Sequence, residues 1–288
     1  MGRLRRLDRE LVRRHLATSR SHASQIITAG RVSVDGRVIS KPASQIDPAQ
    51  AITVVKSSQV EYASRGGYKL AGVLDILGKD APEIAGKRCL DAGASTGGFT
   101  DVLLRRGASS VVAVDVGYGQ LRWELQQDGR VEVHDRTNIR YLDPQEIGEP
   151  AQLIVGDLSF ISLKLVIPAL VSASTLDAEY LLMVKPQFEV GREKLGAGGV
   201  VRDLEDHFRT VMGVILSASE NGLGLKMVAA SPLPGPSGNV EYFIYLGRGV
   251  PMPSNLKIKD MVKAAIAAGP AGKPGNNLDE QVKEETNE

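Results

Sequence analysis

The stretch CLDAGASTGGFTDVLL, residues 89–104, joins a short apolar run to a helical pattern through an acid and several small residues. The apolar run predicts a buried strand that ends at Asp91, and a helix is expected to begin at Phe99. The glycines between them let the backbone turn tightly and approach a ligand closely, and they are Gly93, Gly97 and Gly98. The stretch therefore predicts a strand, a ligand-binding turn and a helix.

Strand and helix patterns alternate from Lys87 onward. Strands are expected near 88–92, 111–116, 131–134, 153–157, 179–185, 225–231 and 240–246. Helices are expected near 97–107, 119–127, 163–174 and 203–220. This alternation predicts an α/β fold, with helices on both faces of a mostly parallel sheet. Because only PLPGPSGN separates the last two strands, we expect them to pair in antiparallel fashion.

The predicted turn favours one nucleotide-like ligand over another. The second strand ends in Asp115, where a carboxylate can accept hydrogen bonds from ribose hydroxyls. The turn reads GASTGG rather than GxGxxG, and Asp91 just before it would repel a pyrophosphate but suits an ammonium. We therefore favour S-adenosylmethionine (SAM) over NAD, with a turn that binds nothing as a third reading. Asp135, after the third strand, either reaches the adenine or lies in a solvated loop.

Four charged residues fall where the strand ends of such a sheet would bring them together. Asp157 and Lys185 close the fourth and fifth strands, and Glu241 opens the last, antiparallel strand. Lys69 lies in the first turn of a helix marked by apolar spacing over 70–77. Two lysines and two carboxylates suit deprotonation of a hydroxyl that attacks a sulfonium methyl group. The alternative for Lys185 and Glu241 is ordinary surface charge.

The motif DLSF, residues 157–160, bears on the atom that would be methylated. Methyltransferases of base amino groups carry an Asn/Asp-Pro-Pro-aromatic turn at this place, and they need no lysine base. Here the prolines are missing and two lysines are present, so an oxygen acceptor is favoured over a nitrogen acceptor.

Charge is divided unevenly along the 288 residues. Residues 1–60 hold 11 Lys and Arg against 4 Asp and Glu, whereas the remainder holds 24 against 30. A small α+β unit is expected over 1–58, with helices, a hairpin at Asp35-Gly36 and a strand at 51–55, followed by a linker at 59–64. A basic unit before an acidic one predicts a polyanionic partner, the alternative being a merely solvated basic face.

Other features limit the function classes. With the single cysteine Cys89, no disulfide framework is possible, and a reducing cytoplasm fits. No apolar signal segment and no membrane-spanning run is expected. The scattered histidines, His15, His22, His134 and His207, predict no metal site. Trp123 is expected in the core or in the wall of the cofactor pocket rather than stacked on a base. Residues 249–288 are expected to form an extension that is disordered from about 270.

Two resemblances join these observations. RLDRELVRRHLATSRSHASQIITAGRVSVDGRVISKP, within residues 3–55, resembles an S4 RNA-binding domain. The body, expected over 65–248, resembles an FtsJ-like 2′-O-ribose methyltransferase, a class I SAM-dependent fold with a seven-stranded sheet. The motifs SRGGYKL, DAGASTGGFTD, DLSFISL and VKPQFE together are similar to the TlyA family, whose members are often labelled hemolysin A and of which characterised members methylate cytidine ribose in ribosomal RNA.

The resemblance implies roles for particular residues. Lys185 would be the base, and the residues that position ribose and lysines would be Lys69, Asp157 and Glu241. The expected SAM site, including the turn and strand-end residues above, is Asp91, Gly93, Ser95, Gly97, Gly98, Phe99, Asp115, Asp135 and Phe160. The expected RNA contacts are Arg6, Arg20, Lys41, Arg65, Arg136 and Arg140.

The predicted activity is therefore SAM-dependent 2′-O-methylation of ribosomal RNA by a monomer that binds ribosomal subunits and no membrane. Three other readings stay open at this point. An RNA-binding protein without turnover would bind SAM but transfer nothing. A pore-forming hemolysin lacks a secretion signal and a spanning segment in this sequence. A pseudouridine synthase shares the S4 domain but has no use for the SAM-type turn.

Overall fold

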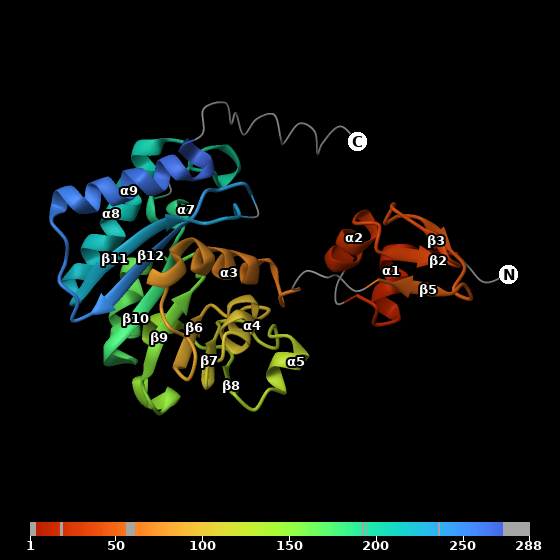
Figure 1. Cartoon of the computed structure of the whole chain (residues 1–288), viewed down its shortest axis with the longest axis horizontal. Coiled ribbons are helices and arrows are strands. Elements are labelled where there is room, and N and C mark those ends of the chain that lie inside the picture. Colours follow the sequence, from red (N-terminus) through yellow and green to blue (C-terminus); the bar gives the residue numbers. More distant parts are fainter. Residues whose placement is uncertain are drawn as a thin grey trace. The chain divides into compact units, whose positions relative to one another are not determined.

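The computed structural model describes residues 4–17, 20–55, 61–191, 193, 195–235 and 237–272. The chain divides into two compact units, Met1–Glu61 and Tyr62–Glu288 (Figure 1). Residues 59 and 60 of the proposed linker and nearly all of the tail expected to be disordered lie outside the described residues.

In the described residues of the first unit, two helices accompany two small sheets. Its helices are α1 (Leu7–Arg13) and α2 (Arg20–Thr28), and its strands are β1 (Arg5–Arg6), β2 (Val32–Val34), β3 (Arg37–Val38), β4 (Gln45–Ile46) and β5 (Ile52–Val54). The strand order is β3-β2-β5 in one sheet and β1-β4 in the other. The expected hairpin is present, because Asp35 and Gly36 both have positive φ, as a tight primed turn requires.

The core of the first unit is small and apolar. The side chains of Leu7 and Leu11 on α1 and of Ile27 on α2 are fully buried. Val32 and Val34 meet them from the alternate positions of β2. Helical and strand periodicities therefore place their apolar faces toward one shared interior, as the sequence predicts.

The second unit is built on one seven-stranded sheet with the order β11-β12-β10-β9-β6-β7-β8. The strands are β6 (Arg88–Ala92), β7 (Ser110–Val114), β8 (Val131–His134), β9 (Ala151–Gly156), β10 (Ser174–Val184), β11 (Leu223–Ala230) and β12 (Tyr242–Arg248). β12 runs antiparallel to both β10 and β11, whereas β10, β9, β6, β7 and β8 are parallel. The predicted α/β fold with an antiparallel last strand is confirmed.

Helices cover both faces of this sheet (Figure 1). α3 (Arg65–Leu77), α4 (Gly98–Arg105) and the short α5 (Trp123–Gln126) pack on one face, and α6 (Ile167–Ser172), α8 (Leu204–Glu220) and α9 (Asn255–Ala268) on the other. α7 (Pro186–Glu189) follows β10. In β6, Cys89 faces the first group and Leu90 the second, so this strand is apolar on both sides.

Three local expectations differ from the structure. Only Trp123–Gln126 of the expected helix 119–127 is helical. The expected helix 163–174 is divided into the 3₁₀ turn Leu163–Leu165 and α6, which starts afresh with Pro168 in its first turn. Since α3 begins at Arg65, Lys69 lies in its second turn rather than its first.

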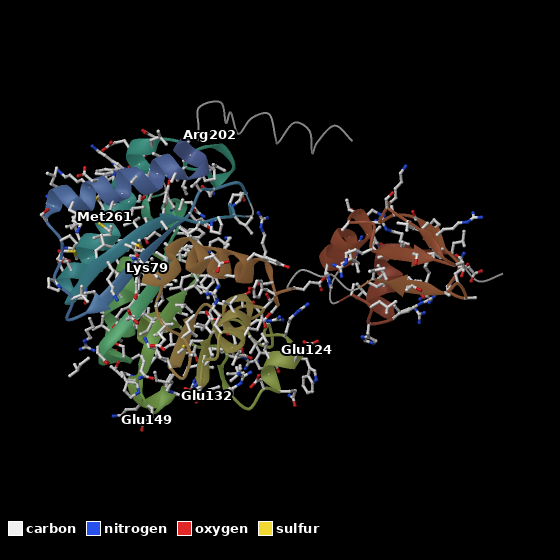
Figure 2. All side chains as sticks on the ribbon, viewed as in Figure 1. Lys79, Glu124, Glu132, Glu149, Arg202 and Met261 are labelled. Carbon is white, nitrogen blue, oxygen red and sulfur yellow. The ribbon has the colours of Figure 1, made fainter. Side chains whose placement is uncertain are left out.

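The segment after Arg248 contains a helix that the sequence reading did not predict. Ile258, Val262 and Ile266 of α9 are buried and repeat every four residues, the spacing of one helix face. Partly buried Met261 packs against the same core (Figure 2). The signal is present in the sequence, but Pro251, Pro253 and the polar tail that follow Arg248 obscure it.

Candidate active site

The candidate site lies where the order of the parallel strands reverses. β6 is flanked by β7 on one side and by β9 on the other, so the turns after β6 and β9 leave the sheet in different directions and open a crevice. Gly93, with φ of +86°, lines this crevice. A Cβ atom there would lie 3.0 Å from the carbonyl oxygen of Asp157, so the two turns approach as closely as glycine permits.

A cavity of about 500 Å³ occupies the crevice. Of the residues predicted for the cofactor or the chemistry, Gly93, Ser95, Asp115, Asp157 and Phe160 line it. The sequence reading missed the remaining lining residues, which are Val114, Val116, Gln120, Thr137, Asn138, Leu158, Ser159, Ile139 and Ile161. Thr137 and Asn138 follow the third parallel strand closely, and that position is the signal that could have identified them.

Asp115 connects two turns at the cavity wall through hydrogen bonds to their backbone. Its Oδ2 accepts a hydrogen bond from Ser95 N at 2.8 Å, and its Oδ1 accepts one from Gly117 N at 2.7 Å. Ser95 itself has a positive φ of 48°. Each carboxylate oxygen keeps a second lone pair, so Asp115 can hold the turn and still accept from ligand hydroxyls.

Asp91 is fully buried at the end of β6. Its Oδ2 accepts a hydrogen bond from Thr100 Oγ1 at 2.7 Å, whereas Oδ1 has no partner in the described part of the chain. Burial raises the pKa of Asp91 to about 7, although the hydrogen bonds from Thr100 oppose the rise. An unpaired buried carboxylate oxygen fits a cationic ligand group, such as the ammonium of SAM.

The other predicted cofactor residues make contacts within the protein. Gly97, with φ of +94°, would place a Cβ 2.2 Å from Leu125 Cδ1, so glycine there allows α5 to pack. Gly98 faces the start of α3, where a Cβ would lie 2.3 Å from Ser64 Oγ.

Phe99 is buried and stacks on Phe243, with ring centroids 6.2 Å apart. Asp135 Oδ2 accepts from Gly119 N at 2.8 Å. None of Asp91, Gly97, Gly98, Phe99 or Asp135 lines the cavity wall described above, and direct cofactor contact by these five stays a prediction.

The four predicted catalytic residues come together at the carboxyl edge of the sheet. In the β10–β12 ladder Val184 pairs with Tyr242, and the same register sets Lys185 opposite Glu241. Asp157 follows β9, the other neighbour of β10. The first turn of α3 passes beside it, because a Cβ on Gly66 would lie 3.5 Å from Asp157 Oδ2.

These residues form two ion pairs. Lys69 Nζ donates a hydrogen bond to Glu241 Oε2 at 2.5 Å, and both side chains are buried. Lys185 Nζ lies 2.7 Å from Asp157 Oδ1 and donates to Ser159 Oγ at 2.8 Å. The contact with Oδ1 does not have hydrogen-bond geometry, so this oxygen keeps acceptor capacity. Only the second pair has a member on the cavity wall, which places Lys185 nearer to a bound ligand.

Three predicted RNA contacts belong to the second unit: Arg65 begins α3, Arg136 lies in a turn, and Arg140 lies in the 3₁₀ turn Ile139–Tyr141. Arg136 stands over the Tyr118 ring at 4.2 Å, and Arg140 over the Tyr141 ring at 5.2 Å. Both tyrosines are exposed. Arg65 donates to the carbonyl of Pro234 at 3.2 Å.

In the first unit, two of the predicted RNA-binding residues are bound to the carboxylate of Asp8. Arg6 binds its carboxylate through two hydrogen bonds, of 3.1 and 2.8 Å, and Arg20 through one of 3.2 Å. Asp8 is buried, while Arg20 is exposed and Arg6 partly so. Lys41 is exposed on the same unit. The buried carboxylate therefore orients cationic groups at the surface.

The expectation for Trp123 is wrong. Its side chain is 69% exposed, and it does not belong to the residues that line the cavity. α5 is only one turn long and buries Leu125 instead, which leaves its first residue facing solvent.

Within the described ranges, no three His, Cys, Asp or Glu side chains are grouped to hold a metal ion. His207 is a structural residue, since its Nε2 lies 2.9 Å from the carbonyl oxygen of Val201 and its Nδ1 3.0 Å from the Tyr242 hydroxyl.

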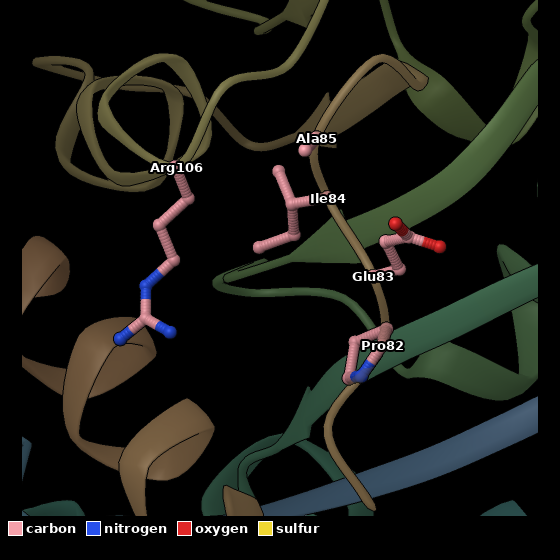
Figure 3. A pocket seen from close by; sticks show the side chains of 5 residues that line it. All are labelled: Pro82, Glu83, Ile84, Ala85 and Arg106. Atoms are coloured by element: carbon pink, nitrogen blue, oxygen red, sulfur yellow. The ribbon is translucent and has the colours of Figure 1, made fainter. Parts of the chain in front are cut away.

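A second hollow, of about 380 Å³, lies at the amino end of β6 (Figure 3). It is lined by Pro82, Glu83, Ile84, Ala85 and Arg106. The Arg106 guanidinium is already paired with Asp75 at 2.7 Å. Ligands of parallel sheets bind at the opposite edge, so we do not assign it a role in the chemistry.

Comparison with known proteins agrees with this geometry. Residues 62–248 match the model of the FtsJ-like methyltransferase family, and residues 5–52 match that of the S4 domain. The chain belongs to the FtsJ-like methyltransferase family. Both predicted resemblances are thereby confirmed, and SAM, the methyl donor of this family, is the cofactor that the sequence predicted.

Three similar proteins extend over most of the chain. The 16S/23S rRNA (cytidine-2′-O)-methyltransferase TlyA of Mycobacterium tuberculosis is 52% identical over 94% of this methyltransferase and 100% of its own length. Hemolysin A of Brachyspira hyodysenteriae is 34% identical over 83% and 98%. A solved structure from Streptococcus thermophilus, described as a hemolysin, has a TM-score of 0.69 at 33% identity and covers 99% of this chain and 100% of its own.

Two of these similar proteins carry the label hemolysin, which raises the question of a membrane-spanning helix. In the ranges that the structure covers, no helix combines the length and the apolar character needed to cross a bilayer.

Proposed function

We propose that this methyltransferase transfers a methyl group from SAM to the 2′-hydroxyl of ribose in ribosomal RNA. The observation that carries the proposal is the position of Lys185, whose ammonium group contacts Asp157 and Ser159 at the cavity wall. The 52% identity to a protein named as a cytidine-2′-O-methyltransferase supports cytidine as the nucleoside.

Each member of the tetrad has a distinct task in this proposal. Lys185, in its neutral form, accepts the proton of the 2′-hydroxyl. Asp157 and Ser159 hold the Lys185 nitrogen in place through their oxygen atoms. The buried ion pair of Lys69 and Glu241 lies beside Lys185, because Glu241 is opposite Lys185 in the β10–β12 ladder. This pair keeps one positive and one negative charge at fixed positions next to the base.

The cofactor supplies an electrophilic methyl group on a sulfonium. With SAM bound, this methyl group would pass to the ribose oxygen as the C–S bond breaks, with the sulfur keeping that electron pair, and Lys185 would take the proton of the 2′-hydroxyl. The protein orients these groups: Asp115 accepts from the cofactor ribose, and the orphaned Asp91 Oδ1 accepts from the cationic end. Positioning of this kind supplies several kcal/mol of rate enhancement, up to about 7–11.

The S4 unit would dock the enzyme on its substrate. Arg6, Arg20 and Lys41 present positive charge at the surface, and contacts with phosphates supply affinity without reading sequence. Arg65, Arg136 and Arg140 would contribute further phosphate contacts from the catalytic unit. A ribosomal substrate supports action in the cytoplasm, and we propose that a monomer acts on assembled subunits.

The test is methyl transfer to purified 30S and 50S subunits, both of which are used because the M. tuberculosis relative is named for 16S and 23S RNA. Labelled SAM is followed by alkaline hydrolysis of the RNA. Label in hydrolysis-resistant dinucleotides is the expected result, because a 2′-O-methyl group blocks cleavage. Label in ordinary mononucleotides would mean base methylation, and SAM binding without transfer would mean an RNA-binding protein.

A further inference from the structure

Two stretches of this chain, Asp157–Leu163 and Lys185–Glu189, lie side by side beyond the ends of β9 and β10. Their contacts keep a nearly constant offset in sequence. Lys185 meets Asp157 and Ser159 at the near end, and the Phe188 ring lies 5.1 Å from that of Phe160 in the middle. At the far end, the carboxylate of Glu189 contacts Ser162 and Leu163.

Glu189 binds the first stretch through both oxygens. Its Oε2 accepts from Ser162 Oγ at 2.6 Å, and its Oε1 accepts from the Leu163 backbone N–H at 2.7 Å. Leu163 begins the 3₁₀ turn Leu163–Leu165, so this N–H has no acceptor within the turn. Hydrogen bonds to a charged acceptor are the strong ones among hydrogen bonds in proteins.

The stretch that Glu189 holds is not relaxed. Phe160 has a positive φ of 63°, which costs an aromatic residue about 1–3 kcal/mol. The residue is 91% exposed, so burial does not offset this cost. Such a conformation persists only where its surroundings impose it. Contacts that can impose it flank Phe160, since Lys185 binds Ser159 before it and Glu189 binds Ser162 after it.

We infer that Glu189 is a positioning residue, which fixes the stretch Asp157–Leu163 so that Ser159 and Asp157 hold the Lys185 nitrogen in its working place. The inference rests on the proposed function, in which Lys185 is the base. Without the Glu189 carboxylate, Phe160 can relax toward negative φ, and this relaxation moves Ser159, its neighbour in the chain. A displacement of about 1 Å at a reacting group can cost on the order of a hundredfold in rate.

The main experiment compares Glu189→Ala, Glu189→Gln, Ser159→Ala and the double variant Glu189→Ala/Ser159→Ala in the full chain. We expect Glu189→Ala to lower kcat about ten- to a hundredfold, with a smaller change in KM for the subunits. Glu189→Gln keeps an acceptor for Leu163 N–H and should retain kcat within about threefold. Because Glu189 acts through Ser159, the double variant should be no worse than the poorer single variant.

The matched control is Glu83→Ala, which removes an exposed carboxylate at the opposite edge of the sheet and should leave kcat unchanged. Ser162→Ala deletes only one donor of the contact and guards against failure of Glu189→Ala to fold. It should lower kcat by less than Glu189→Ala does. Fully additive effects in the double variant, or an unchanged kcat in Glu189→Ala, would overturn the inference.

A second readout does not depend on methyl transfer. Amide hydrogen exchange over residues 158–163 should be faster in Glu189→Ala than in the wild type, and close to wild type in Glu189→Gln. Equal exchange in all three proteins would refute the positioning role. If the wild type methylates no ribose, the proposed function fails, but hydrogen exchange still decides whether Glu189 holds this stretch.

Discussion

Lys69 Nζ and Glu241 Oε2 lie 2.5 Å apart in the protein interior, although 172 residues separate them in the chain. One is on α3 before the first strand of the sheet, and the other directly precedes the last strand. The antiparallel direction of β12 is what brings them together, because it places the beginning of that strand at the carboxyl edge of its neighbours.

Breaking this pair should reduce stability as well as activity. Glu241→Ala leaves the Lys69 ammonium buried without its counter-ion, which costs about 3–5 kcal/mol. For a unit of this size that corresponds to a melting temperature lower by roughly 10 °C. Thermal unfolding followed by circular dichroism measures it.

The double variant Lys69→Met/Glu241→Met separates the two roles. An apolar pair removes both charges, so stability should return toward that of the wild type while methyl transfer stays lost. Recovery of activity in the double variant would show that the pair serves the fold alone.

Lys185→Ala should abolish turnover and spare binding. Loss of a general base typically lowers the rate by about 10²–10⁴-fold. The dissociation constants for SAM and for ribosomal subunits should stay within a few-fold of the wild type. Methyl transfer at the wild-type rate in this variant would remove Lys185 from the role of base.

SAM binding should release a proton near neutral pH. In the protein without ligand, burial raises the pKa of Asp91 to about 7, so the carboxyl is largely protonated at pH 6. The cationic ligand favours the ionised form, and affinity for SAM should therefore increase from pH 6 to pH 8. Calorimetry in buffers of different ionisation enthalpy measures the release, and Asp91→Asn should show none.

The same raised pKa has a consequence for stability. Because the folded-state pKa lies above the unfolded value near 4, ionisation of Asp91 is easier in the unfolded chain, and its contribution to stability falls as pH rises from about 4 to 7. Asp91→Asn should abolish this part of the pH dependence in thermal unfolding of the ligand-free protein.

The S4 unit should lose stability in acid through Glu10. This buried carboxylate accepts hydrogen bonds from Arg13 and Arg14, and the bonds from Arg13, followed by those from Arg14, lower its pKa to about 2. The contribution is present above the unfolded pKa, near 4.5, and is lost as pH falls toward 2. Glu10→Gln should melt at a lower temperature at pH 7, and the difference from wild type should shrink below pH 4.

Replacing the arginines that bind Asp8 should weaken the salt dependence of RNA binding. Arg6→Gln and Arg20→Gln each remove one cation that can contact a phosphate, so the slope of log K against log salt should fall by about 1 per variant. Filter binding to ribosomal subunits at several salt concentrations gives the slope. An unchanged slope in both variants would place the RNA on another surface, and SAM affinity serves as the internal control.

The sequence predicted those site residues that directly follow a strand. Asp115, Asp157 and Lys185 each follow an apolar run that is a strand in the structure, and parallel strands bring such positions to one edge. Residues on loops far from a strand end gave no such signal, which is why Gln120 was missed although it lines the cavity.

The sequence by itself determined the order of the elements, the glycine turn after β6 and the opposite direction of β12, because these follow from local periodicity and from short connections. Only the tertiary structure decided that Trp123 faces solvent, that Phe99 stacks in the core, and that Glu189 grips Ser162. Each of these outcomes depends on which surfaces pack against each other in three dimensions. Periodicity in the sequence shows which face of a helix or strand is apolar, but it does not show which other element that face contacts.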